Sequence, residues 1–185
     1  APVSGLFLVV LLMALNWGLE AFKWRQLVRP LEQVSLLKAV AATLAGCSVS
    51  LVTPNRTGEF VGRVLYLRPE LRIAGASLTV LGNLSQVLIT LVLGTLGLLF
   101  MVLLELPLPV RTGWPLSAMA FVAVLFTLVA AALFLFPQLL RHLLDLVPFL
   151  RRYDTHFRVL SEVPRSALLT TLALCGLRYI VFTAQ

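Results

Sequence analysis

The stretch IAGASLTVLGNLSQVLITLVLGTLGLLFMVLL, from Ile73 to Leu104, decides the fold because it contains no charged residue. It exceeds the ~20 apolar residues that a helix needs to cross a bilayer. A second uncharged stretch runs from Thr112 to Leu140. Hydrophobic residues make up 59% of the 185 residues and the mean hydropathy is +0.97, well above what the core of a soluble domain needs. The sequence therefore predicts an integral membrane protein.

We expect an all-α fold that forms a single polytopic membrane domain over residues 1–185. It should contain four spans, at about residues 1–24, 76–104, 116–136 and 166–185. Leucines alternate with charged residues over 138–160, which predicts an amphipathic helix lying on the membrane surface. The chain starts without a cleavable signal sequence and ends in apolar residues. We therefore expect it to be a fragment of a larger helical bundle.

Residues 35–53 form a shorter apolar piece, which predicts a re-entrant helical segment rather than a full span. Its many small residues permit the close helix packing that a buried hairpin requires. Lys and Arg number four over 23–38, four over 54–76 and five over 138–165, but one over 105–114. A segment that enters and returns puts the three basic regions on the cytoplasmic side, as the positive-inside rule requires.

The net charge of +7 comes from 15 Lys and Arg against 8 Asp and Glu. The basic residues flank apolar spans, which indicates cytoplasmic loops near anionic lipid rather than a nucleic-acid partner. Cys47 and Cys175 lie in apolar sequence, and neither His142 nor His156 has companions at metal-ligand spacing. We expect no metal, no cofactor and no catalytic constellation, so an independent enzyme site is not predicted.

A polar segment, Thr53-Pro-Asn-Arg-Thr-Gly-Glu-Phe-Val-Gly-Arg63, interrupts the apolar sequence. Thr57 is a candidate helix N-cap and Glu59 would lie in the first turn, four residues before Arg63, where the two can pair. A helix N-terminus beside arginines is an anion site, and lipid phosphate is the natural anion there. The candidate ligands for phosphate in this segment are Asn55, Arg56, Thr57 and Arg63. The alternative is a cytoplasmic loop whose arginines only follow topology.

Three charged residues, Glu20, Lys23 and Arg178, lie within predicted spans. Arg178 needs a partner or a wet cavity if it lies inside the membrane, although it could instead snorkel near the chain end. Glu20 could pair with Lys23 or Arg25 at the interface, which we consider more plausible than a proton relay. Lys23 and Arg25 can also snorkel toward lipid headgroups.

On these residues the chain resembles the flippase-like membrane family, whose best known member is the lysylphosphatidylglycerol synthase transmembrane region. The matching pieces are spread over most of the chain: Asn16 with Lys23-Trp24-Arg25, the block Ser48…Thr53-Pro54…Gly58-Glu59…Arg63, and Arg178-Tyr179. The chain departs from the family at Asn55-Arg56, where members often have Gly after the Pro. It also shows no soluble aminoacyl-transfer domain.

The resemblance implies a multi-pass protein of the bacterial inner membrane that moves lipids between leaflets. We expect Arg56, Arg63 and Arg178 to hold the phosphate of a phospholipid or polyprenyl-phosphate lipid, with Glu59 and Glu20 orienting the arginines or contacting a cationic headgroup. One alternative is a structural subunit that scaffolds a larger membrane complex, as a homo-oligomer or with other subunits. Another is the membrane half of a lipid-modifying, aminoacyl-phospholipid enzyme.

Overall fold

The computed structural model describes residues 3–53, 58–106, 113–148 and 153–185, and every regular element in these ranges is helical. This confirms the predicted all-α membrane fold. In chain order the elements are α1 (Val3–Val28), α2 (Leu36–Val52), α3 (Gly58–Val64), the short 3₁₀ helix η2 (Pro69–Leu71), α4 (Arg72–Leu103), α5 (Leu116–Leu135), α6 (Pro137–Asp145), α7 (Asp154–Phe157), α8 (Val159–Glu162) and α9 (Arg165–Thr183).

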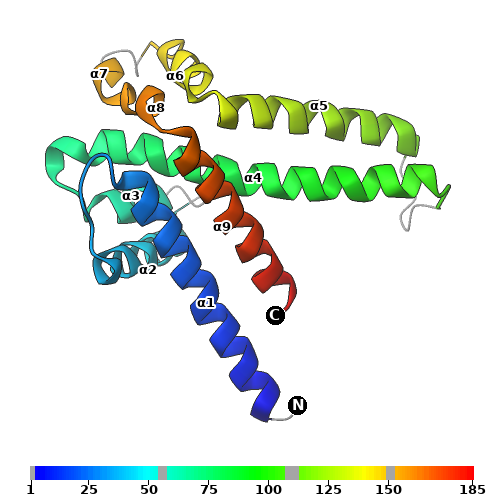
Figure 1. The fold of residues 1–185 in the computed structure, drawn as a ribbon, viewed down its shortest axis with the longest axis horizontal. Coiled ribbons are helices and arrows are strands. Elements are labelled where there is room, and N and C mark those ends of the chain that lie inside the picture. Colours follow the sequence, from blue (N-terminus) through cyan, green and yellow to red (C-terminus); the bar gives the residue numbers. More distant parts are fainter. Residues whose placement is uncertain (1–2, 54–57, 107–112, 149–152) are drawn as a thin grey trace.

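The long helices form two pairs that diverge from each other (Figure 1). α4 and α5 lie side by side, and α1 lies beside α9, so that the two ends of the chain are close together. α9 also crosses α4, and α1 contacts α4 near the end where α2 and α3 lie. The first and last helices therefore meet although they are far apart in sequence.

Four helices among the described residues are long and apolar enough to cross a membrane: Gly5–Val28, Pro69–Leu103, Leu116–Leu135 and Arg165–Thr183. Each leaves many large apolar side chains exposed, as expected of helices surrounded by lipid. α2 is apolar but shorter than these four. How deeply α2 and α3 enter the bilayer stays a prediction.

α2 and α3 form a tight antiparallel hairpin, and glycines at the crossing allow the two helices to approach closely. A Cβ placed on Gly62 of α3 would lie 2.6 Å from Cα of Gly46 in α2, and one on Gly58 would lie 2.6 Å from the carbonyl oxygen of Val49. The two backbones touch, so no side chain larger than hydrogen fits at the crossing. This close approach brings the polar side chains of α3 against α1.

Interhelical hydrogen bonds join α1 and α9 to α4. The buried indole Nε1 of Trp24 donates to Oγ1 of Thr79 at 3.1 Å, and that hydroxyl donates to the carbonyl of Gly75 at 2.8 Å. Oγ of Ser85 and Sγ of Cys175 lie 2.9 Å apart. Polar contacts of this kind fix the register of apolar helices that otherwise slide against each other.

Candidate functional site

Glu20 of α1 is the centre of a buried charge cluster. Its carboxylate is 2.8 Å from Nζ of Lys23, 2.8 Å from Nη1 of Arg63 and 2.5 Å from Nη1 of Arg178. These cations come from α1, α3 and α9, and Glu20 is only 3% exposed. One carboxylate thus links three helices, an arrangement that offsets the cost of burying each charge.

Arg63 occupies the middle of the cluster. It is 1% exposed, and its other terminal nitrogen pairs with Glu59, one turn earlier in α3. The predicted ion pair between these two residues is therefore present. Together with Lys23 and Arg178, the cluster sets three cations against the carboxylates of Glu20 and Glu59, which leaves one positive charge in excess.

Arg178 is the least buried of the three cations, with 28% of its side chain exposed. Its Nε donates to Oδ1 of Asn16 at 2.5 Å and its Nη1 to Oε1 of Gln86 at 3.4 Å. Polar groups of α1 and α4 therefore orient the guanidinium without covering it. The guanidinium of Arg178 can therefore donate hydrogen bonds to a further, anionic ligand.

Lys23 corrects one of our expectations. It does not snorkel: it is 1% exposed, pairs with Glu20 and donates to the carbonyl of Gly82 at 3.2 Å. The pair of Glu20 with Lys23 that the sequence offered is therefore confirmed, and the carboxylate and carbonyl inside the protein satisfy the ammonium in place of lipid headgroups.

The cluster opens into a cavity of about 360 Å³, which we call the polar cavity. Five helices contribute to it, and two thirds of its lining residues are charged or carry an amide or hydroxyl group. Its walls are Trp17, Glu20, Thr43, Cys47, Ser50, Glu59, Phe60, Arg63, Asn83, Gln86, Val87 and Arg178.

The polar cavity brings four of the predicted site residues together: Glu20, Glu59, Arg63 and Arg178. The other three, Asn55, Arg56 and Thr57, lie outside the described residues. Sequence reasoning missed Thr43, Cys47 and Ser50, which follow each other at helical spacing along one face of α2. That spacing indicates one polar helix face, but the small residues around it favoured helix packing over a binding site as its explanation.

Three members of the cluster lie within helices that are long and apolar enough to span a membrane, and Arg63 and Glu59 lie on the short helix α3. At ~1.5 Å per residue, Glu20 lies ~12 Å from the end of α1 at Val28, and Arg178 lies ~8 Å from the end of α9 at Thr183. Charged groups at such depth normally face a protein interior or a water-filled cavity and have a function.

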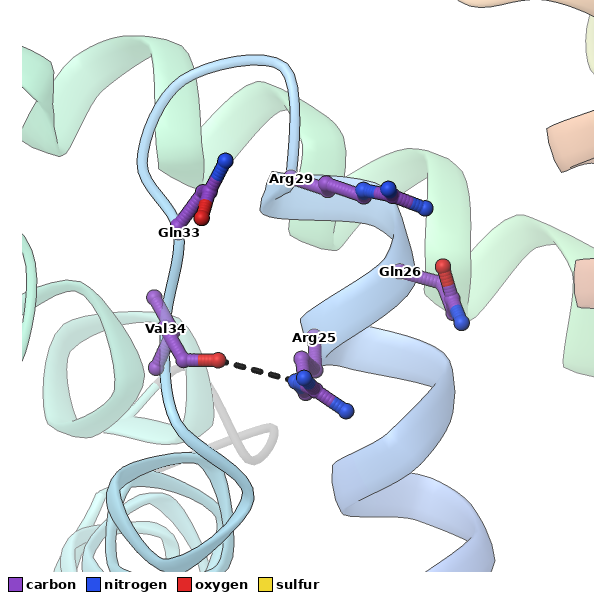
Figure 2. A pocket seen from close by; sticks show the side chains of 5 residues that line it. All are labelled: Arg25, Gln26, Arg29, Gln33 and Val34. Atoms are coloured by element: carbon purple, nitrogen blue, oxygen red, sulfur yellow. Dashed lines mark hydrogen bonds between the residues drawn. The ribbon is translucent and has the colours of Figure 1, made fainter.

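A second polar pocket, of about 230 Å³, lies at the end of α1 and shares no residue with the polar cavity. Figure 2 shows Arg25 and Arg29 beside Gln26, with Gln33 and Val34 on the loop opposite. Nε of Arg25 donates to the carbonyl of Val34 at 2.8 Å, which ties the loop to the helix.

The loop after α1 is also tied to α2. Nζ of Lys38 lies 3.0 Å from Oε1 of Glu32, and this hydrogen bond holds the pKa of Glu32 below its ordinary value. The carboxylate additionally accepts a hydrogen bond from the backbone N–H of Arg68. Glu32 therefore links the loop before α2 to the first turn of α2 and to the segment that follows α3.

The family of the lysylphosphatidylglycerol synthase TM region matches residues 1–183. The chain belongs to this family. Membership agrees with the resemblance found in the sequence and gives this multi-pass membrane protein a role in handling anionic phospholipids. No curated protein and no solved structure matches the chain. Among the described residues, no group of three or more His, Cys, Asp and Glu could hold a metal ion.

Proposed function

We propose that the polar cavity binds the phosphate of an anionic lipid headgroup within the membrane and helps the lipid to change leaflet. The observation that carries this proposal is Arg178, a guanidinium of α9 that is oriented by Asn16 and Gln86 but remains open to the cavity. Charge-assisted hydrogen bonds from arginine are among the strongest that phosphate accepts.

A polar path is needed because a charged headgroup cannot cross hydrocarbon unaided. Placing a charge at the bilayer centre costs at least ~2.5–3.5 kcal/mol on insertion scales. The excess positive charge of the cluster offsets a phosphate, and the cavity supplies hydroxyl and amide groups in place of water. The lipid's acyl chains would stay outside, against the exposed apolar faces of the helices.

In this proposal, α2 and α3 enter the bilayer from the cytoplasmic side and return, as the distribution of Lys and Arg indicates. Their hairpin then forms the wall that separates the cavity from surrounding lipid. Asn55, Arg56 and Thr57 connect the two helices and are proposed as further phosphate ligands. The membrane would be the bacterial inner membrane, and the ligand a phospholipid or a polyprenyl-phosphate lipid.

The test is exchange of fluorescent phosphatidylglycerol between the leaflets of proteoliposomes, followed by chemical quenching of the outer leaflet. Arg178→Gln removes the exposed charge, and we expect the exchange rate to fall roughly tenfold, the loss of about one charge-assisted hydrogen bond. Arg165→Gln is the matched control, because it removes an exposed arginine from the same helix outside the polar cavity. It should leave the rate within about twofold of the original.

Equal rates for the original chain and Arg178→Gln would contradict the proposal. They would favour the scaffold alternative, in which the chain takes part in a homo-oligomer or binds other subunits through its apolar faces. A lipid-modifying enzyme would instead accumulate an altered headgroup in the same vesicles, which thin-layer chromatography of the extracted lipid would reveal.

A further inference from the structure

Two polar groups in the wall of the polar cavity have no hydrogen-bond partner among the described residues. They are Oγ1 of Thr43 and Nε of Arg63, and both residues are only 1% exposed. Leaving a buried donor unsatisfied costs about 1–3 kcal/mol, so such groups usually indicate a bound water or ligand.

Thr43 departs from the usual behaviour of helical threonines in this protein. Thr79, Thr90 and Thr127 each donate to the carbonyl four residues earlier, at 2.8–3.0 Å. Thr171 of α9 is also buried without a partner in the described chain, but it does not line the polar cavity. Thr43 therefore combines an unused hydroxyl with a place in the wall of the polar cavity.

Nε of Arg63 lies close to the same part of α2. A Cβ on Gly46 would lie 3.5 Å from Nε of Arg63, and Thr43 is one turn before Gly46 on that helix. The terminal nitrogens of Arg63 are occupied by Glu20 and Glu59. The groups left without a partner here are the Nε–H of Arg63 and the hydroxyl of Thr43. Both can donate a hydrogen bond to the same acceptor.

We propose that Thr43 and Nε of Arg63 form an inner subsite of the polar cavity that receives one oxygen of a phosphate group. This inference rests on the proposed function and deepens it, because it names Thr43 as a ligand-binding residue. A phosphate oxygen accepts hydrogen bonds from both donors and carries the charge that the cluster lacks. The ligand phosphate then bridges Arg178 at the open side and Arg63 at the inner side.

Cys47 provides the readout, since it lines the cavity one turn from Thr43 and is partly exposed, whereas Cys175 is fully buried. The rate of its modification by N-ethylmaleimide is measured in detergent with increasing phosphatidylglycerol, and Cys47→Ser shows the background. Inorganic phosphate is run in parallel. Protection by the lipid at a far lower concentration than by inorganic phosphate identifies a lipid headgroup as the source of the phosphate.

Thr43→Val replaces the hydroxyl by a methyl group of similar size. We expect the lipid concentration for half-protection to rise about tenfold. Thr43→Ser keeps the hydroxyl and should stay within about twofold of the original. Thr171→Val is the matched control, because it removes a buried hydroxyl away from the cavity. Its lipid concentration for half-protection should also stay within about twofold of the original.

Half-protection of Thr43→Val at the original concentration would overturn the subsite while leaving the proposed function in place. The same holds if Thr171→Val weakens protection as much as Thr43→Val, because the effect then reflects general packing. If no phospholipid protects Cys47 in the unaltered chain, the proposed function fails first, and the subsite with it. Melting temperatures of all variants establish that each is folded.

Discussion

Replacing Glu20 by glutamine is expected to destabilise the protein by about 3–5 kcal/mol, because Lys23 and Arg178 then lose the carboxylate that they pair with and Arg63 keeps only Glu59. Lys23 is 1% exposed and does not line the polar cavity, so it cannot recruit water to replace the lost charge. The amide of glutamine also presents hydrogens where every neighbour donates one. Thermal unfolding in detergent, followed by circular dichroism, measures the loss.

The matched control is Glu32→Gln, which removes the partner of Lys38 in a partly exposed pair at the surface and should cost much less than Glu20→Gln. Combining Glu20→Gln with Lys23→Met should recover part of the loss, because it removes one of the uncompensated cations and keeps most of the apolar stem. A Glu20→Gln variant that melts like the original chain would show that Glu20 does not hold the cluster together.

Gly62→Ala is expected to separate α2 from α3. The added Cβ would lie 2.6 Å from Cα and 2.7 Å from N of Gly46, and 2.8 Å from the carbonyl carbon of Ala45. All three atoms belong to backbone, which cannot turn aside as a side chain can. Overpacking of this kind costs about 1–3 kcal/mol or more, and the melting temperature should fall accordingly.

The control for this substitution is Gly94→Ala in α4, where an added Cβ meets nothing within 4 Å. Its stability should be unchanged or slightly higher, since alanine favours the helix by up to ~1 kcal/mol. Because the hairpin presents Glu59 and Arg63 to the polar cavity, Gly62→Ala should also slow lipid exchange. Equal melting temperatures for Gly62→Ala and the original chain would mean that the hairpin is looser than its backbone contacts indicate.

The number and type of the long helices could be predicted from the sequence, because an uncharged stretch such as Ile73–Leu104 has few alternatives to a membrane helix. The pairing of Glu59 with Arg63 was also predictable, since residues four apart share a helix face. Both depend only on local spacing. The need of Arg178 for a partner followed from its place in an apolar helix.

The identity of that partner could not be predicted. Arg178 contacts Asn16 and Glu20 because the last helix packs beside the first. The spacing of residues within one helix does not indicate which other helix it packs against. Local spacing did give the pair of Lys23 with Glu20, three residues earlier, as one alternative. The burial of Lys23 against the carbonyl of Gly82 depends instead on the packing of α1 on α4. Long-range packing, which local spacing does not encode, therefore assembled the candidate site.

The central claim is that a water-accessible, anion-attracting cavity lies within the membrane-spanning part of the chain. Its most direct test is the reaction of Cys47 in proteoliposomes with two membrane-impermeant thiol reagents, one carrying a sulfonate and one a trimethylammonium group. Each rate is divided by the rate of the same reagent with a free thiol in solution, and Cys47→Ser supplies the background.

The account predicts that both reagents react with Cys47, and that the normalised rate is higher for the sulfonate, because the cluster holds one excess positive charge. Arg178→Gln should abolish that preference. No reaction with either reagent, or a preference for the cationic one, would contradict the account.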